Sequence, residues 1–593
     1  MDATPAASGL PLRVADFSTL AEALDYAAQG NTGYNYYNSA LELYAKVPYA
    51  DLKIDAQKLA RRLIGLGTNR GSRVAIVADT HPDFMRFFYA CQYAGLIPVP
   101  LPASVHLGGR NAYVSQLRRL LSICQADIGM APEGFISYLK EAAQDLKMRF
   151  LGSPQEFYDL PGSSAPLRPS EPHEIAYLQY TSGSTRFPRG VMITQKAVLN
   201  NLLVICKHGI QVRPQDRAVS WLPYFHDMGL VGLVLAPMAA QVSVDYLSTR
   251  DFAMRPRLWL SLMSQNQATI SVSPPFGYEL AARRVREKEI QNFDLRSWRV
   301  AGVGAEPIRT EPLDRFADLL EPSGFDRHSY TPCYGMAECS LAVTFSSLGQ
   351  GVDVDRVDTD ILATEQKAIP LHPSQNEKTV HTTSFTNCGA PLPGYEVEIR
   401  NERGELLPER HCGTLYVRGP SIMSGYFGDL LSTREVLSPD GWLNTGDLAY
   451  RVGKNIVITG REKDLIILNG RNIWPQDLEY LAEQQTEVRT GDTSAFSVTD
   501  GDGEERAVLM VECRESKEEK RADLRKRLHR QIREEFGIDC LIELVPRNTL
   551  HRTTSGKLSR SGAQKEYLER IAAERSSGPA EDLYAATLRR RDV

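Results

Sequence analysis

The segment Ile175–Val191 reads IAYLQYTSGSTRFPRGV and decides how the rest of the chain is interpreted. Its β-rich first half leads into five small residues, which are Thr181, Ser182, Gly183, Ser184 and Thr185. Their hydroxyls and exposed backbone N–H groups can surround phosphate oxygens, so this loop is a candidate anion site. A Ser/Thr/Gly loop after a strand is more often an ordinary turn, and the spacing does not match the GxxxxGK[ST] loop of P-loop NTPases. The complete string, with Arg189 and Gly190, is far more specific than the small residues alone.

On both sides of this loop, from about Arg73 to Glu338, short β-rich runs alternate with amphipathic stretches. The clearest strand candidates are RVAIVADT, IPVPL, IAYLQYTS, AVSWLPYF, ATISVSPPF and WRVAGVGAEP. Such alternation is typical of parallel sheets covered by helices. Further along, YEVEIRNERGELL, GTLYVRGP and LAYRVGKNIVITG predict shorter strands joined by Gly-containing turns, as in a small antiparallel or barrel-like lobe.

We therefore expect an α/β protein with two domains. Residues 1–460 form a large N-terminal domain of two helix-covered, mainly parallel β-sheet lobes plus a small β-barrel-like lobe. A hinge at 461–466 leads into a small, mobile α+β domain at 467–593, with strand candidates SAFSVT and AVLMVEC and the charged helix EEKRADLRKRLHRQIREEF. Residues 346–385 exceed the usual loop length of about 12–15 residues, so we interpret them as an insertion. Within it, VDVDRVDTDIL and KTVHTTSF alternate in a way that predicts strand pairing.

Composition excludes several classes of function. The 593 residues carry 68 Lys and Arg against 73 Asp and Glu, a formal net charge of -5, so nucleic acid is not an expected partner. Nine cysteines without a CxxC pair argue against a disulfide scaffold or a zinc ribbon and favour a reducing, cytoplasmic location. The N-terminus lacks the pattern of a signal peptide. The longest uncharged apolar stretch, Met228–Val244, contains Pro237 and is shorter than the ~20 residues of a membrane span, so no span is expected.

Seven motifs in order resemble the adenylate-forming (ANL) superfamily, which includes acyl-CoA synthetases, peptide-synthetase adenylation domains and firefly luciferases. They are TSGSTRFPRGV at 181–191, YFHDMGL at 224–230, GVGAEP at 302–307, YGMAE at 334–338, GWLNTGDL at 441–448, GREKD at 460–464 and TTSGKLSR at 553–560. Arg186 and Arg189 replace the Gly and Lys of many relatives, but both retain or add positive charge. The resemblance implies a ligase in which a carboxylate attacks the α-phosphate of ATP and pyrophosphate leaves. The resulting acyl adenylate is then held for a nucleophile.

The resemblance also implies roles for single residues. Lys557 would be the catalytic lysine, because a flexible ammonium can neutralise charge developing between carboxylate and α-phosphate. Glu338 would hold Mg²⁺ on the ATP phosphates, a role that suits a hard oxygen ligand, although such a residue can also merely cap a helix. Asp447 would accept hydrogen bonds from the ribose hydroxyls, where the alternative is a turn Asp that bonds its own backbone. Lys463 takes the hinge position, and for either lysine the alternative is a solvated side chain.

Further motifs are expected to hold the nucleotide. Tyr334 offers a stacking face, and the segment at 304–306 offers a small-residue backbone that can approach the adenine ring. GVGAEP lacks the third glycine of a dinucleotide-binding fingerprint, so that interpretation is rejected. The complete expected ATP and AMP site comprises Thr181, Ser182, Gly183, Ser184, Thr185, Gly304, Ala305, Glu306, Tyr334, Gly335, Met336, Ala337, Asp447 and Arg461.

By resemblance, His226 lies where the acyl chain enters, and we count it with Lys557 and Glu338 as a catalytic residue. A lone histidine is otherwise more often a satisfied core residue. The expected acyl-binding residues are His226, Asp227, Met228 and Gly229. The charge-free stretch GLVGLVLAPMAA that follows offers an apolar wall for an aliphatic chain, or is only a buried helix.

The insertion, AGLIPVPLPAS at 94–104 and YFHDMGL together resemble the fatty acyl-AMP ligases of this superfamily. This resemblance implies a medium- or long-chain fatty acid as substrate and ATP and Mg²⁺ as cofactors. It implies transfer to an acyl carrier protein, or to a polyketide or nonribosomal peptide synthase, and an insertion that restricts the domain motion needed to form a CoA thioester. Two alternatives stay open: a long-chain fatty acyl-CoA synthetase, and a catalytically silent acyl-adenylate-binding protein.

A basic run at Lys520–Arg530 holds six Lys and Arg and one acidic residue. Such a run could dock an acidic carrier protein. A solvated helix face is the more common explanation.

Overall fold

The computed structural model describes residues 2–103, 109–181, 188–371, 381–468, 471–499, 505–552 and 558–577. The described residues form two compact units. The first unit takes in the described parts of 2–357 together with 383–459, and the second takes in those of 358–382 and of 460–577. The chain therefore passes between the two units near residues 357, 382 and 459. The expected α/β class is confirmed, with parallel sheets in the first unit.

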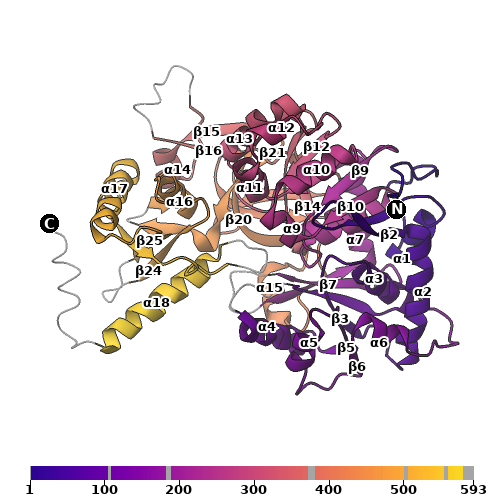
Figure 1. Cartoon of the computed structure of the whole chain (residues 1–593). Helices are drawn as coiled ribbons and strands as arrows, with labels where there is room; N and C mark the ends of the chain where they lie inside the picture. The colour runs from indigo at the N-terminus through magenta and orange to yellow at the C-terminus, as the bar shows by residue number, and fades with distance from the viewer. Residues whose placement is uncertain are drawn as a thin grey trace. The chain divides into compact units, whose positions relative to one another are not determined.

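A nine-stranded sheet forms the centre of the first unit (Figure 1). In order across the sheet, its strands are β17 (Ala390–Pro391), β14 (Ala342–Phe345), β13 (Tyr330–Gly335), β12 (Val300–Val303), β11 (Ile270–Ser273), β9 (Arg217–Ser220), β10 (Ser243–Leu247), β1 (Gly33–Tyr37) and β2 (Leu43–Pro48). The six strands from β13 to β1 run parallel, and the strands at both edges pair antiparallel. Strand β1 thus pairs with β10, which is about 200 residues away in the sequence.

A second sheet in this unit is entirely parallel and has the order β4 (Ile97–Leu101), β3 (Arg73–Val77), β5 (Ala126–Met130) and β6 (Phe150–Gly152). The two expected parallel lobes are therefore present. A separate hairpin joins β7 (Ile175–Thr181) to β8 (Arg189–Thr194) in antiparallel register. We expected IAYLQYTS to belong to a parallel sheet, and the structure places it in this hairpin instead. The strand expected at AVSWLPYF ends at Ser220, ahead of Pro223, which cannot donate to a ladder.

The helices of the first unit cover these sheets. They are α1 (Leu20–Ala27), α2 (Tyr49–Gly65), α3 (Pro82–Ala94), α4 (Gly109–Ile123), α5 (Ile136–Ala142), α6 (Pro154–Tyr158), α7 (Gln195–Val204), α8 (Ala236–Ala239), α9 (Thr249–Met254), α10 (Arg257–Gln265), α11 (Pro275–Arg284), α12 (Glu287–Ile290), α13 (Thr310–Leu320) and α15 (Leu430–Val436). The Tyr34 ring on β1 lies 5.0 Å from Tyr49 of α2 and 5.6 Å from Tyr246 of β10, so aromatic packing fills this side of the sheet.

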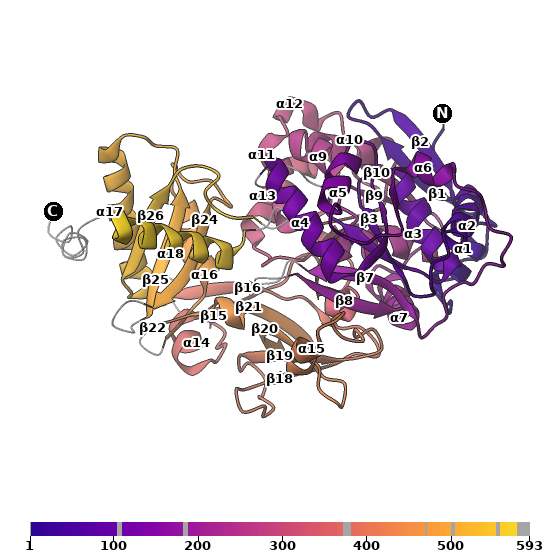
Figure 2. The same cartoon turned by 90° about the horizontal axis from the view of Figure 1, so that it is seen from below.

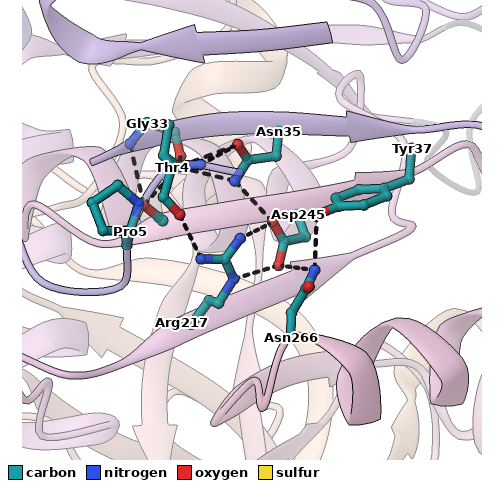
Figure 3. A network of polar contacts seen from close by, with 9 residues as sticks. Thr4, Pro5, Gly33, Asn35, Tyr37, Arg217, Asp245 and Asn266 are labelled. Atoms are coloured by element: carbon teal, nitrogen blue, oxygen red, sulfur yellow. Dashed lines mark hydrogen bonds and ion pairs between the residues drawn. The ribbon is translucent and has the colours of Figure 1, made fainter. Parts of the chain in front are cut away.

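The opposite face of β1, β10 and β9 carries a buried polar network (Figure 3). Arg217 donates from Nε and Nη2 to the two carboxylate oxygens of Asp245, each over 2.6 Å. Asn35 and Asn266 each donate to the same carboxylate over 2.8 Å, and Arg217 Nη1 donates to the backbone oxygen of Thr4 over 2.6 Å. The Asp245 side chain is 0% exposed and that of Arg217 is 8% exposed. The ion pair is buried, and further hydrogen bonds to both partners help to offset the cost of removing the two charges from water.

The expected small β lobe is a four-stranded sheet in the order β18 (Glu396–Arg400), β19 (Gly413–Arg418), β20 (Leu443–Val452) and β21 (Asn455–Arg461). Strand β19 pairs antiparallel with both β18 and β20.

The second unit contains a three-stranded sheet of β24 (Thr493–Thr499), β25 (Glu505–Glu512) and β26 (Cys540–Val545) (Figure 2). Successive side chains of β25 point to opposite faces of the sheet, so alternate residues pack into two different hydrophobic clusters. Leu509 packs with α16 (Pro475–Glu483) and α17 (Glu518–Phe536), whereas Met510 packs with α18 (Arg560–Ser577). Neither β26 nor the hairpin of β22 (Ile466–Leu468) and β23 (Arg471–Ile473) was expected from the sequence.

The insertion contributes to both units. Strands β15 (Val354–Asp358) and β16 (Thr382–Thr386) pair with each other, as the alternation predicted. In the first unit, Asp355 accepts hydrogen bonds from Arg410 Nη1 over 2.9 Å and from the Tyr450 hydroxyl over 2.8 Å. In the second unit, helix α14 (Thr359–Glu365) packs on β23, and its Asp360 forms an ion pair with Arg471.

Two further expectations concern the whole chain. All nine cysteines lie within described residues, and each is a free thiol. Among the helices that the structure describes, none is both long and apolar enough to cross a membrane.

Candidate functional site

The described part of the expected nucleotide site centres on Tyr334, near the end of β13, and Asp447 on β20. The Tyr334 hydroxyl donates to Asp447 Oδ2 over 2.6 Å, so two residues 113 positions apart in the sequence meet directly. Burial, and then the nearby Asp447 carboxylate, raises the pKa of Tyr334 well above its usual value. The phenol therefore stays protonated at neutral pH, and it can hold the Asp447 carboxylate in one orientation.

The backbone next to this pair approaches its neighbours closely. A Cβ on Gly335 would lie 1.8 Å from the backbone oxygen of Leu341, and a Cβ on Gly304 would lie 2.8 Å from the backbone oxygen of Cys333. Only glycine fits at these two positions without a backbone shift. Ala305 follows with a left-handed φ of 69° and is exposed, and Glu306 is half-buried. Met336 is half-buried and Ala337 is buried.

Glu338 lies on a short 3-10 helix at Ala337–Cys339 and is only 9% exposed. The Tyr426 hydroxyl donates to Glu338 Oε1 over 2.9 Å. Burial raises the pKa of the neighbouring Cys339 thiol well above its usual value, and the Glu338 and Asp447 carboxylates add to that rise. Within the described residues no cluster of three or more His, Cys, Asp or Glu is arranged to hold a metal. A lone carboxylate of this kind suits Mg²⁺, which commonly binds through one or two carboxylates plus substrate phosphates and water.

The expected acyl-binding residues lie at the start of a π-helix. Met228–Leu235 forms a π-helix, a form that often marks functional sites, and its Asp227 cap accepts a hydrogen bond from the Met228 backbone N–H over 2.7 Å. Gly229 is buried within this helix, and His226 is half-buried just before it. The Gln179 amide donates to the backbone oxygen of Phe225 over 2.5 Å, which ties this segment to β7. The structure thus gives Asp227 a capping role that the sequence did not reveal.

Several expected site residues cannot be placed beside these groups. Thr181 ends β7, but Ser182, Gly183, Ser184, Thr185 and Lys557 lie outside the described residues. Arg461 and Lys463 are described, belong to the second unit and are exposed. Their roles stay predictions.

The structure also places at the site one residue that sequence analysis missed, Tyr426. It lies in SIMSGYFGDL, after the GTLYVRGP strand, and it contacts Glu338 across 88 positions. A single tyrosine in a loop carries no signal of such a contact, and no spacing rule links it to Glu338.

The basic run at 520–530 lies on α17, and part of its charge is neutralised locally. Arg525 pairs with Glu518 over 2.9 Å, and Arg527 pairs with Asp523 over 3.0 Å and with Glu487. These contacts favour the solvated helix face over a carrier-protein dock, because the two arginines already have acidic partners.

Known proteins resemble this chain in sequence and in fold. A family model described as "AMP-binding enzyme" matches residues 26–427. A putative acyl-CoA synthetase of Caulobacter vibrioides is 43% identical over 567 residues, covering 95% of this chain and 98% of that protein. The medium-chain-fatty-acid–[acyl-carrier-protein] ligase JamA of Moorena producens is 29% identical, covering 93% and 96%. A structure from a study of fatty acyl-adenylate ligases of E. coli and L. pneumophila has a TM-score of 0.90 and 47% identity, covering 95% of this chain and all of that one.

Proposed function

This chain belongs to the AMP-binding enzyme family and is an ATP-dependent, AMP-forming ligase, and from that premise we propose that its substrate is a medium- or long-chain fatty acid. The observation that carries the proposal is the Tyr334–Asp447 hydrogen bond, and the buried Glu338 follows Tyr334 closely in the sequence. A carboxylate oriented by a phenol is suited to accept hydrogen bonds from ribose, and the buried Glu338 carboxylate is suited to a cation on the phosphates. The fatty acid is supported by the apolar π-helix at 228–235 and by the names of the relatives.

In the proposed first step, an oxygen of the fatty acid carboxylate forms a bond to the α-phosphorus of ATP. The bond from that phosphorus to the bridging oxygen breaks, and pyrophosphate leaves with both electrons. Catalysis of such a step rests on positioning and on stabilising charge. Glu338 would hold Mg²⁺, which would neutralise phosphate charge. Asp447 would orient the ribose, Tyr334 would face the adenine, and Lys557 would neutralise charge between the reacting groups.

In the proposed second step, the thiol of a carrier-protein phosphopantetheine attacks the acyl carbon. A thioester forms, AMP leaves, and the thiol proton passes to solvent. The carrier protein as acceptor is supported by the relative from Moorena producens. The second candidate acceptor is CoA, which the name of the relative from Caulobacter vibrioides favours. A cytoplasmic location, suggested by the cysteine content, belongs to the same proposal.

Pyrophosphate release tests the first step. We expect purified protein to release pyrophosphate with C12–C16 acids and ATP, and we expect Lys557→Ala to abolish the release. Absence of release with any of these acids would refute the fatty acid substrate. Full release by the Lys557→Ala variant would refute the assigned role of that lysine. Mass spectrometry of products formed with CoA or with holo-carrier protein then separates the two acceptors.

The insertion provides a test of acceptor choice. We expect removal of about residues 352–379 to permit formation of acyl-CoA, because α14 and its Asp360–Arg471 ion pair belong to the same unit as the C-terminal sheet. The deletion also removes Asp355 with its bonds to Arg410 and Tyr450. The double variant Asp360→Ala/Arg471→Ala leaves those bonds in place and is the gentler test. A folded, adenylating deletion variant that still makes no acyl-CoA would contradict this explanation.

A further inference from the structure

The segment from Met423 to Phe427 lies beside the strand that leaves the candidate phosphate loop. The Met192 backbone N–H donates to the oxygen of Gly425, and the Ser424 N–H donates to the oxygen of Met192, each over 3.0 Å. The Phe427 N–H donates to the oxygen of Gly190 over 2.8 Å. The segment therefore pairs with β8 through an isolated antiparallel bridge between Val191 and Tyr426.

The same segment is bound to the helix that carries Glu338. The Met423 backbone N–H donates to the Glu338 backbone oxygen over 2.8 Å. The Tyr426 backbone N–H donates to the Thr433 hydroxyl over 2.9 Å, which fixes the segment from its other side. Both the main chain and the side chain of Glu338 thus contact this one segment.

Tyr426 lies between a cation and an anion. Its hydroxyl donates to Glu338 Oε1 over 2.9 Å, and the guanidinium carbon of Arg189 lies 5.0 Å from the centre of its ring. A guanidinium at that distance is attracted to the face of an aromatic ring. Tyr426 is only 5% exposed, so its hydrogen bond to Glu338 is shielded from competing water.

We propose that Tyr426 is a positioning residue, which holds the Glu338 carboxylate in the orientation that receives the magnesium of bound ATP. The inference rests on the proposed function of Glu338. A carboxylate on a three-residue helix can turn about its side-chain bonds, and a hydrogen bond to one oxygen restricts that freedom while the carboxylate stays charged. Groups that orient a metal-binding carboxylate in this way typically contribute about 10- to 100-fold to metal affinity or activity.

The test compares Tyr426→Phe with wild-type protein in two measurements. In the first, the Mg²⁺ concentration for half-maximal pyrophosphate release is expected to rise by about 10- to 100-fold. In the second, the unfolding temperature is measured with ATP plus EDTA and with ATP plus Mg²⁺. We expect the increment due to Mg²⁺ to shrink in the variant. The midpoint without nucleotide is expected to fall as well, because a buried hydrogen bond to a charged group is lost.

The matched control is Tyr450→Phe. Tyr450 is also buried and also donates to a carboxylate, Asp355, over 2.8 Å, but that carboxylate has no proposed role with nucleotide. We expect this control to leave both Mg²⁺ measurements unchanged. In a Glu338→Gln background the Mg²⁺ increment should be absent, and adding Tyr426→Phe should change nothing more.

Three results would overturn the proposal. They are a Tyr426→Phe variant with wild-type Mg²⁺ dependence, a variant whose only change is a lower midpoint without nucleotide, and a wild-type protein without any Mg²⁺ increment. A wild-type protein that shows the increment but releases no pyrophosphate with any fatty acid would refute the proposed substrate instead. The thermal measurement would then still test Tyr426.

Discussion

The buried Arg217–Asp245 pair gives the sharpest prediction about stability (Figure 3). Replacing Asp245 by Ala removes four hydrogen bonds to a fully buried carboxylate, which come from Arg217, Asn35 and Asn266. At about 1.5–3 kcal/mol for each bond to a charged group, the gross loss has an upper limit of roughly 6–12 kcal/mol. Relaxation and entry of water reduce this, and breaking one partner of a buried pair typically costs about 3–5 kcal/mol. We therefore expect Asp245→Ala to lower the free energy of unfolding of the first unit by about 3–5 kcal/mol.

The assay is urea denaturation followed by tryptophan fluorescence, because Trp221, Trp259 and Trp298 are buried in the same unit. The double variant Arg217→Met/Asp245→Leu provides the comparison. It removes both charges, so no uncompensated guanidinium remains, and we expect it to be more stable than Asp245→Ala. If Asp245→Ala costs less than about 1 kcal/mol, or if the double variant is the less stable of the two, the reasoning about a buried charge is wrong.

Three further predictions test other parts of the molecule. Tyr334→Phe should raise the KM for ATP by about 10-fold with little change in kcat, because Asp447 loses its hydrogen bond; pyrophosphate release measures this, and an unchanged KM would contradict it. Arg560→Met should speed hydrogen exchange in β24 and β25 but not in the first unit, because Arg560 forms half-buried ion pairs with Glu479 and Asp464, each over 2.8 Å. Exchange in β24 and β25 that stays as slow as in wild-type protein would contradict this. Burial opposes ionisation of Asp83, but hydrogen bonds from His81, Tyr158 and Arg86 outweigh it and lower its pKa to about 2. The ionised Asp83 then contributes its full stabilisation above pH ~4, and this contribution is lost as the pH falls toward 2. When the free energy of unfolding is measured across this range, wild-type protein should lose about 2 kcal/mol more than Asp83→Asn.

Local sequence patterns predicted much of the fold. Runs such as RVAIV and AVLMVE are rich in β-branched residues and lie within strands of the structure, and the charged run at 518–536 forms one helix. Strand β1 was missed because GYNYY contains no aliphatic residue and gains its stability from tyrosine packing and from pairing with β10. Strand β26, CLIELV, follows helix α17 and pairs in parallel with β25, so no hairpin turn links it to its partner strand.

Site residues could be predicted from the sequence where they belong to a recognisable motif. Tyr334, Glu338 and Asp447 were singled out from YGMAE and TGD, but their mutual arrangement depends on contacts across more than 100 residues. Asp227 caps a π-helix, and such helices have no recognisable sequence period. Tyr426 belongs to no motif, and only the pairing of its segment with β8 brings it to Glu338.

Where the structure describes the chain, its three passages between the two units have a practical consequence for protein engineering. A chimera that exchanges only the sequence after residue 459 would join a foreign C-terminal sheet to the native α14. The Asp360–Arg471 ion pair and the packing of α14 on β23 would then be mismatched. The described parts of 358–382 and 460–577 belong to one unit, so both pieces should come from the same parent.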